Sequence, residues 1–333
     1  MSADSVATPG PAERRAVHRT SVVVIGAGAM GGTFAGALAS AGLDVVVIDP
    51  APEIGSSLRE HGLRVTHADG SMSRHEIRYQ ADAAGLEPPD FVFFFVKAVH
   101  NEAAARGAAH LIGPDTIVAT VQNGIGHTEV LSSIVPLERL VVGVTNEGAN
   151  ALEPGHVYHY NAATTTLGPA IPFADIVPAE RVAEVLTRGG LSATAVADSL
   201  SGVWSKLVFN SAYSGVAAVT GLSLAGLGSE PHVWELCKRV ARETGRIATL
   251  SGATVDVDAA IARAEQLYAS AVAATSPAGK ASMLLDIEAH RHSEVDALNG
   301  AVVRAAHALG EEAPLNAALH ALVRGIEHSW TSA

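Results

Sequence analysis

Short apolar runs alternate with helical stretches along the chain up to about residue 198. The runs Val22–Ile25, Val45–Ile48, Phe91–Val96 and Ile117–Val121 are apolar at nearly every position. A strand with one face in water alternates apolar and polar residues, whereas a strand covered on both faces is continuously apolar. The pattern therefore predicts a doubly wound parallel sheet with helices on both sides.

Three further runs are closer together and are separated by turn residues. They span Leu140–Thr145, His156–Tyr160 and Thr164–Leu167, and their short connections predict antiparallel strands at the sheet edge. A helix over Arg181–Thr187 and a last strand over Ala193–Ala197 complete the predicted α/β part.

The pattern changes after Leu200. As far as Ile326, strand patterns are absent and Ala, Leu, Glu and Arg recur with the period of a helix. Turn residues interrupt this region at Gly221–Pro231, Ser251-Gly252 and Ser276–Gly279. The region is predicted to be entirely helical.

The predicted fold class is a Rossmann-type doubly wound α/β domain followed by an all-helical C-terminal domain. The first domain spans residues 21–198 and the second, for substrate binding and dimerisation, spans residues 199–330. Residues 1–20 lack periodicity and the apolar segment of a secretion signal, so a flexible N-terminal extension is expected there.

Composition limits the partners. The 333 residues include 22 Lys+Arg and 34 Asp+Glu, a formal net charge of −12, which argues against nucleic acid and anionic membranes. Cys237 is the only cysteine, which excludes an internal disulfide and fits the cytoplasm. The uncharged segment 21–43 contains six glycines and divides into strand, turn and helix, so no membrane span is expected.

A glycine motif follows the first predicted strand and opens a helix. Its residues are Gly26, Ala27, Gly28, Ala29, Met30 and Gly31, a GxGxxG pattern. Such glycines allow a tight turn and a close approach of the backbone to a pyrophosphate, which the N–H groups of the helix N-terminus bind. The motif predicts a dinucleotide site, and a glycine-rich turn without a ligand is the alternative.

Asp49 ends the second predicted strand, where the adenosine ribose of a dinucleotide lies. A carboxylate there accepts hydrogen bonds from the ribose hydroxyls of NAD and repels the 2′-phosphate of NADP. No Lys or Arg occurs between Asp49 and Leu58. We therefore expect NAD as the cofactor, and the alternative is a turn aspartate before Pro50.

Lys206 lies in a predicted helix that is apolar on nearly every face. Asn210 and Ser214 follow at i+4 and i+8 and form a ladder with it. Burial lowers the pKa of a lysine and a nearby carboxylate raises it, which makes Lys206 a candidate proton donor near neutral pH. The alternative is a lysine whose ammonium group reaches solvent from the helix end.

A second predicted helix, Ser282–Leu298, places Glu294 on the same stripe as the apolar residues Met283, Ile287 and Leu298. The carboxylate is expected to face the core, either in a structural ion pair or in a site. The histidines of the chain match no closed metal site, so no metal is expected.

Together these motifs resemble the ketopantoate reductase family, from Val22 to about Ile326. Six pieces match in order across both predicted domains. They are GAGAMG at 26–31, Val96-Lys97-Ala98, Gln122-Asn123-Gly124, Trp204-Ser205-Lys206-Leu207 with Asn210, Ser282-Met283-Leu284-Leu285-Asp286-Ile287, and Arg291-His292-Ser293-Glu294-Val295-Asp296 followed by Asn299-Gly300.

The resemblance implies reduction of a 2-oxo acid in a cleft between the two domains, with Lys206 as general acid on the carbonyl group. Asn123 and Lys97 would flank the nicotinamide half of the cofactor, with Ala149 near it. Glu294 would contact a cofactor ribose or help to position Lys206, and it joins Asn123 as a candidate catalytic residue. The implied substrate contacts are Lys206, Asn210, Ser214 and Ser282.

Two departures from the family pattern bear on specificity. Ser214, Leu224 and Gly279 stand where ketopantoate reductases usually present asparagines, so partners for the 4-hydroxyl of ketopantoate are missing. Asp49 stands where this family, which usually prefers NADPH, often has an arginine. Both departures resemble the NAD-dependent D-2-hydroxyacid dehydrogenases of the D-mandelate type within the same family.

We therefore predict a cytoplasmic oxidoreductase that transfers a hydride between NAD(H) and a 2-oxo acid or related carbonyl compound. NADPH-dependent 2-dehydropantoate 2-reductase of pantothenate biosynthesis is the alternative. A dinucleotide-sensing protein without turnover is a rival from another class. The expected partners are a small carbonyl or hydroxy acid substrate and a second copy of the chain in a homodimer.

Overall fold

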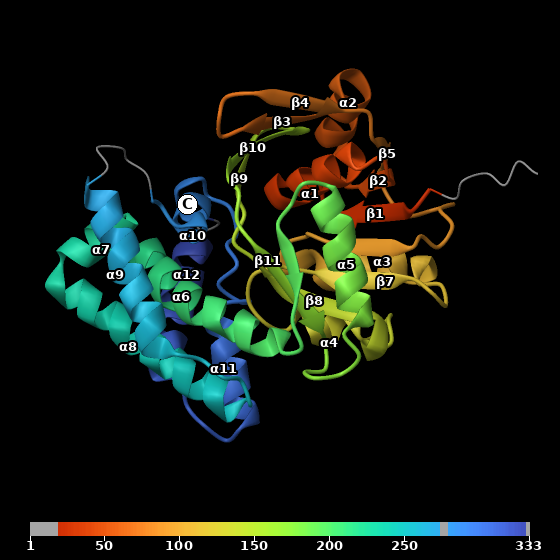
Figure 1. The fold of residues 1–333 in the computed structure, drawn as a ribbon. Coiled ribbons are helices and arrows are strands. Elements are labelled where there is room, and N and C mark those ends of the chain that lie inside the picture. Colours follow the sequence, from red (N-terminus) through yellow and green to blue (C-terminus); the bar gives the residue numbers. More distant parts are fainter. Residues whose placement is uncertain (1–18, 274–278, 331–333) are drawn as a thin grey trace, which may run out of the picture.

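The computed structural model describes residues 19–273 and 279–330, which form an α/β part and a helical part side by side (Figure 1). The flexible extension expected over residues 1–20 lies almost wholly outside the described residues. The main sheet has the order β12-β11-β8-β7-β6-β1-β2-β5. Its strands are β1 (Ser21–Ile25), β2 (Asp44–Ile48), β5 (Arg78–Gln80), β6 (Phe91–Phe94), β7 (Ile117–Thr120), β8 (Leu140–Thr145), β11 (Thr165–Pro169) and β12 (Ala193–Ala195).

The strands from β5 to β8 in this order are parallel. The continuous apolar runs predicted this for β1, β2, β6 and β7, whereas β5 was not predicted. At the other edge β11 pairs antiparallel with β8, and β12 pairs parallel with β11. The predicted antiparallel pairing is therefore correct for β8 and β11. It is wrong for the other edge of β8, which pairs with β7 in parallel because α4 (His127–Leu131) lies in the crossover between these two strands.

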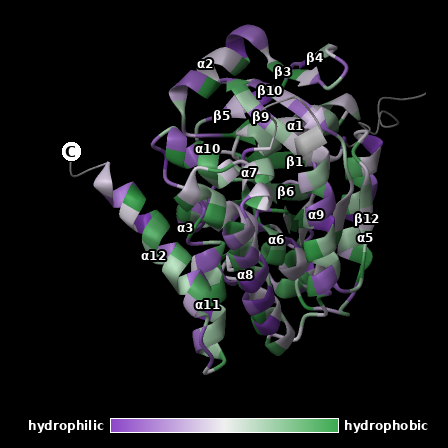
Figure 2. Cartoon of the chain, turned by 90° about the vertical axis from the view of Figure 1, so that its left-hand side faces the viewer, coloured by the Kyte–Doolittle hydropathy of each residue, from purple (hydrophilic) through white to green (hydrophobic). Residues whose placement is uncertain are grey.

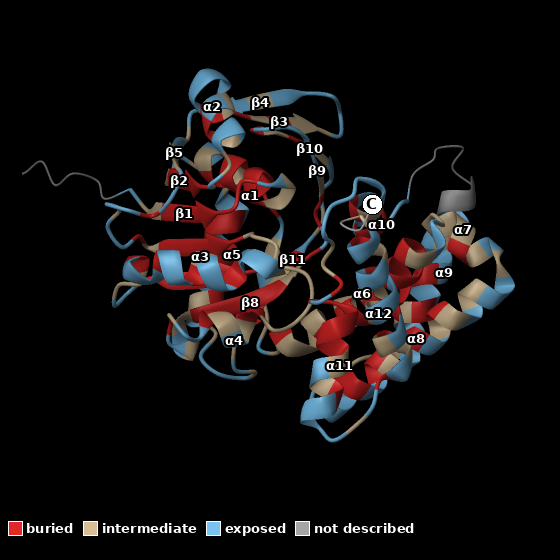
Figure 3. Ribbon diagram, turned by 180° about the vertical axis from the view of Figure 1, so that it is seen from behind, coloured by how far each residue is buried: buried red, intermediate tan, exposed pale blue. Residues whose placement is uncertain are grey.

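The two faces of the sheet bury alternate residues of each strand. Val22 and Val24 of β1 pack with α1 and α5, whereas Val23 and Ile25 pack on the other face with α3 and α4. Figure 3 shows the central strands buried beneath helices whose outer faces are exposed. The helices of the α/β part are α1 (Ala29–Ser40), α2 (Pro52–His61), α3 (Asn101–Ala108), α4 and α5 (Val177–Arg188), with short 3₁₀ turns at Ala98–His100, Ala109–Leu111 and Leu137–Arg139.

A second sheet, of order β4-β3-β10-β9, covers α1 and was not predicted. Its strands are β3 (Leu63–His67), β4 (Met72–His75), β9 (Gly148–Glu153) and β10 (His156–Asn161). The placement of His156–Tyr160 at the edge of the main sheet is wrong, because β10 pairs with β3 and β9 instead. Glycines in α1 allow this close packing, since a Cβ on Gly32 would lie 2.9 Å from the Val157 side chain.

The helical part is arranged around α6, whose first N–H groups are capped by Asp198: the Asp198 carboxylate accepts a hydrogen bond of 3.1 Å from the Ser201 N–H. Trp204 and Leu207 of α6 belong to one apolar cluster, and Val208 and Ala212 belong to another. Apolar and polar residues alternate along α8 and α12 in Figure 2, as expected of helices with one buried face. The helices are α6 (Ser199–Thr220), α7 (Leu224–Ser229), α8 (Pro231–Leu250), α9 (Val257–Ala273), α10 (Ser282–Glu288), α11 (Asn299–Ala308) and α12 (Pro314–Ser329).

The predicted fold class is confirmed, but the predicted helix Ser282–Leu298 is wrong. The helix α10 ends at Glu288, and His290 takes a left-handed conformation with φ of 49°. Arg291 closes this turn, because its N–H donates to the Asp286 carbonyl at 2.8 Å and its Nε donates to Asp286 Oδ1 at 3.0 Å. Met283 and Leu298, which were predicted to share one helix face, still pack in the same apolar cluster. They do so because the chain bends after α10, not because one helix joins them.

Within the described ranges, none of the helices combines the length and the apolar character that crossing a membrane requires. The same residues contain no group of three or more His, Cys, Asp or Glu side chains placed to hold a metal ion.

Candidate active site

The glycine motif forms the turn between β1 and α1. Gly26 has φ of +97°, which favours glycine, and a Cβ on Gly31 would collide with the Gly26 carbonyl oxygen. Gly28 is exposed, and no atom lies within 4 Å of the place where its Cβ would be. Among the described residues no side chain caps the N-terminus of α1. The backbone at Gly28, where α1 begins, is therefore open, which fits the phosphates of a dinucleotide.

Asp49 follows β2 and braces this turn. Its Oδ2 accepts a hydrogen bond of 2.8 Å from the Ala27 N–H, and its Oδ1 accepts one of 3.0 Å from the Ala51 N–H. Each carboxylate oxygen retains a further lone pair for a ribose hydroxyl. The next arginine along the chain, Arg59, lies over the ring of Tyr79, 5.4 Å from its centroid. The Asp49 carboxylate thus lies beside the glycine turn, and its expected contact with a ribose stays a prediction.

Lys206 of α6 lies where the two parts of the molecule meet. Its Nζ donates a hydrogen bond of 2.6 Å to the main-chain carbonyl of Thr145, the last residue of β8. Burial lowers the pKa of Lys206 from 10.5 to about 8, and the Glu294 carboxylate opposes this shift. An amine with this pKa carries a proton at neutral pH and can pass it to a nearby oxygen.

Glu294 and Asn123 face each other across the same junction. Asn123 follows β7, and its Nδ2 donates to Glu294 Oε2 at 3.4 Å. Burial raises the pKa of Glu294, while the Asn123 hydrogen bond and the charges of Lys97 and Lys206 oppose this rise. The structure therefore brings together the three candidate catalytic residues, Lys206, Asn123 and Glu294.

Lys97 also spans the junction. Its Nζ donates to Asp286 Oδ2 at 2.9 Å and to the His292 carbonyl at 3.1 Å. Its expected contact with the nicotinamide half of a cofactor stays a prediction. Sequence reasoning assigned no role to Asp286, although this residue belongs to one of the matching motif pieces and could have been singled out there.

The candidate substrate residues are less closely connected. Asn210 is partly buried and Ser214 is 7% exposed on the face of α6 that carries Lys206, and Ser282 is exposed at the start of α10. Among the described residues none of these three side chains hydrogen-bonds to Lys206 or Glu294. Their roles stay predictions.

Ala149 and two of the positions that depart from the family pattern, Leu224 and Gly279, lie in other elements. Ala149 belongs to β9 and pairs with His159 of β10. The Leu224 N–H donates to the Gly279 carbonyl at 2.9 Å, so two of the three positions that lack an asparagine are neighbours. The missing amides thus leave apolar or empty positions side by side.

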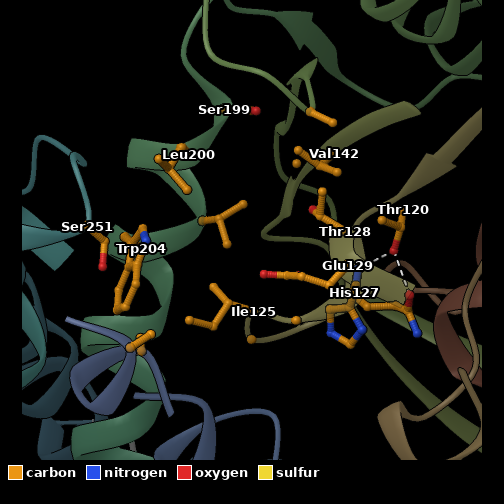
Figure 4. A pocket seen from close by; sticks show the side chains of 18 of the residues that line it. Thr120, Ile125, His127, Thr128, Glu129, Val142, Ser199, Leu200, Trp204 and Ser251 are labelled. Atoms are coloured by element: carbon orange, nitrogen blue, oxygen red, sulfur yellow. Dashed lines mark hydrogen bonds between the residues drawn. The ribbon is translucent and has the colours of Figure 1, made fainter. Parts of the chain in front are cut away.

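A hollow of about 430 Å³ lies between the two parts, next to the segment that follows β7. Its lining includes Gln122 and Gly124, which flank Asn123, but not Asn123 itself. Figure 4 shows Leu200 and Trp204 of α6 on one side of this hollow. Lys206 is not part of this lining, but the hollow and the Lys206 junction share α6, β8 and the segment after β7.

The glycine turn, the carboxylate after β2 and the lysine of lowered pKa at the domain junction define an NAD(P)-dependent oxidoreductase. The chain belongs to the ketopantoate reductase family. The family model described as Ketopantoate reductase PanE/ApbA matches residues 22–171, and the model of its C-terminal domain matches residues 198–327. The family resemblance seen in the motifs is thereby confirmed.

Curated relatives match over nearly the whole chain. The 2-dehydropantoate 2-reductase of Halobacterium salinarum is 31% identical over 303 residues, which cover 91% of this chain and 97% of the relative. The enzyme of the same name from Archaeoglobus fulgidus is 29% identical over 306 residues, covering 92% of this chain and 97% of the relative.

Solved structures agree with this fold. A ternary structure of D-mandelate dehydrogenase with NADH and anilino(oxo)acetate has a TM-score of 0.85 at 26% identity, covering 93% of this chain and 99% of that one. A PanE/ApbA family ketopantoate reductase from Ralstonia eutropha JMP134 has a TM-score of 0.81 at 27% identity, with the same coverage of 93% and 99%. Both kinds of enzyme are thus similar to this chain at nearly equal identity.

Proposed function

We propose that the protein reduces the carbonyl group of a 2-oxo acid, or of a related carbonyl compound, to a hydroxyl group with NADH as the reductant. The observation that carries the proposal is the Lys206 ammonium group, whose pKa is lowered to about 8 at a junction shared with Asn123 and Glu294. A proton donor of this kind is what carbonyl reduction requires beside the cofactor.

A bound NADH would supply the hydride for the carbonyl carbon and would thereby be oxidised to NAD⁺. Negative charge develops on the carbonyl oxygen, and the Lys206 ammonium group stabilises this charge and donates the proton that completes the hydroxyl group. The Thr145 carbonyl holds Nζ in place at 2.6 Å. Glu294 favours the protonated amine through its charge. In the reverse direction the neutral amine accepts the proton from the hydroxy acid.

The Asn123 amide is assigned to the nicotinamide half of the cofactor, with Lys97 and Ala149 nearby. The glycine turn is assigned to the pyrophosphate and Asp49 to the adenosine ribose. NADH rather than NADPH is proposed because Asp49 supplies a negative charge where a 2′-phosphate would lie. The NADH in the D-mandelate dehydrogenase structures supports this choice.

For the substrate side we propose that Ser282 holds the carboxylate and that Asn210 and Ser214 contact the rest of the molecule. A 2-oxo acid with a branched or aromatic side chain fits best, because Leu224 and Gly279 offer no amide to a substrate hydroxyl. Cytoplasmic location and a homodimer formed through the helical part stay predictions.

NADPH-dependent 2-dehydropantoate 2-reductase is the second candidate function, and the names of the curated relatives favour it. The test is a panel of 2-oxo acids that includes ketopantoate, assayed with NADH and with NADPH by the change in nicotinamide absorbance. Highest kcat/KM for a branched or aromatic acid with NADH supports the first proposal. Highest kcat/KM for ketopantoate with NADPH supports the second, and tight dinucleotide binding without turnover of any acid would contradict both.

A further inference from the structure

His127 begins α4, four residues after Asn123, and it is 6% exposed. Its Nε2 lies 2.8 Å from the Asn123 carbonyl oxygen, and its Nδ1 lies 3.3 Å from Nδ2 of Asn101. A carbonyl oxygen only accepts, so Nε2 carries the proton and Nδ1 accepts from the Asn101 amide. Burial lowers the pKa of His127, which agrees with this neutral ring.

The helical part holds the same segment from its other side. The Ile125 N–H donates to the Ala297 carbonyl at 3.3 Å, and the Ala297 N–H donates to the Glu294 carbonyl at 3.0 Å. Gly124 has φ of +90°, and a Cβ there would collide with the Ala297 carbonyl oxygen. The main chain on either side of the contact between Asn123 and Glu294 is therefore fixed, by His127 in the α/β part and by Ala297 in the helical part.

We propose that His127 is a positioning residue for Asn123. Its imidazole holds the Asn123 main chain so that the Asn123 side-chain amide faces Glu294 at the junction. The inference rests on the proposed function in one respect, the assignment of Asn123 to the nicotinamide half of the cofactor. Figure 4 shows the His127 ring among the residues that line the hollow.

The replacement His127→Leu tests this role. Leucine fills the buried position with an apolar side chain. It leaves the Asn123 carbonyl without its hydrogen-bond donor and the Asn101 amide without its acceptor. The Asn123 segment is then free to shift, and a misplacement of about 1 Å near the reacting atoms costs about 10²-fold in rate. We expect kcat to fall by about 10- to 100-fold.

Two control variants separate positioning from folding. His127→Gln can donate to the Asn123 carbonyl through its NH₂ group and accept from Asn101 through its oxygen, so it should restore kcat to within about fivefold of the wild type. His110→Leu removes a similar hydrogen bond, from His110 Nε2 to the Ala83 carbonyl at 2.9 Å, away from the junction. This variant should keep wild-type kcat.

A double-mutant cycle shows whether His127 acts through Asn123. In the background of Asn123→Ala, the further change His127→Leu should lower kcat by less than about threefold, because the amide that His127 positions is already absent. If the two losses multiply in full, or if His127→Gln is as slow as His127→Leu, the positioning role is wrong.

Binding measurements test the same role without turnover. ADP-ribose lacks nicotinamide, so His127→Leu should change its Kd by less than about twofold, whereas the Kd for NADH should rise by about tenfold. Equal losses for both ligands, or none for either, would overturn the proposal even if no 2-oxo acid is reduced. Should His127→Leu fail to fold, His127→Asn replaces it with the same expected losses, because its shorter amide does not reach the Asn123 carbonyl.

Discussion

The pH dependence of carbonyl reduction should report the state of Lys206. Burial lowers its pKa from 10.5 to about 8, which corresponds to about 3 kcal/mol in favour of the neutral amine at about 1.4 kcal/mol per pH unit. Reduction needs the ammonium form. That form makes up about nine-tenths of the enzyme at pH 7 and about one-tenth at pH 9 when the pKa is about 8.

We therefore expect kcat/KM for reduction to fall about tenfold between pH 7 and pH 9, and kcat/KM for oxidation of the hydroxy acid to rise over the same range. The measurement is a pH profile in both directions at saturating cofactor. In Glu294→Gln the carboxylate that raises the Lys206 pKa is gone, so the break should move to lower pH. A flat reduction profile up to pH 10, or a break that moves to higher pH in Glu294→Gln, would refute this account of Lys206.

Further changes test the other assignments. Lys206→Ala should lower kcat by about 10² to 10⁴, the usual contribution of a general acid, with the Kd for NADH nearly unchanged; near-normal turnover would show that another group donates the proton. The wild type should prefer NADH, and Asp49→Asn combined with Pro50→Arg should shift the ratio of kcat/KM values toward NADPH, with Pro50→Arg alone as the control; equal or better wild-type kcat/KM with NADPH would contradict the role of Asp49. Branched or aromatic 2-oxo acids should exceed ketopantoate in kcat/KM by at least about tenfold. Leu224 and Gly279 offer no amide to the ketopantoate hydroxyl, which costs about 1 to 3 kcal/mol when unpaired, whereas each buried methylene of the substrate contributes about 0.8 kcal/mol. A panel in which ketopantoate is the best substrate would reverse that choice.

The central strands β1, β2, β6 and β7 of the main sheet were predictable because each is a local apolar run that is almost wholly buried. The edge strand β5 reads Arg-Tyr-Gln, has no fully buried residue and was not predicted. The second sheet escaped prediction because β4 reads Met-Ser-Arg-His and none of its four residues is fully buried. Its partner β3 packs only alternate residues, Leu63 and Val65, against α1. Strands with one polar face and so few apolar residues do not stand out from a loop until the helix that they cover is known.

The site shows the same division between local and distant contacts. The glycine turn could be predicted because its function depends on consecutive residues. The prediction that Glu294 faces the interior was correct in direction but rested on a helix that ends before this residue. The contact of His127 with Asn101 joins residues 26 positions apart, and no periodic pattern in the sequence relates the two.

An ion pair with access to solvent also joins the two parts at the junction. Lys97 and Asp286 are 189 positions apart and join the two parts through a bond of 2.9 Å, but the Lys97 side chain is 41% exposed. Ion pairs with that much solvent access contribute about 0 to 1 kcal/mol. Such a contact orients the two parts without locking them, since about 1 kcal/mol is less than the free energy that separates populations tenfold. The two parts are therefore held together mainly by the other contacts of the junction, among them the hydrogen bonds from Lys206 to the Thr145 carbonyl and from the Ile125 N–H to the Ala297 carbonyl.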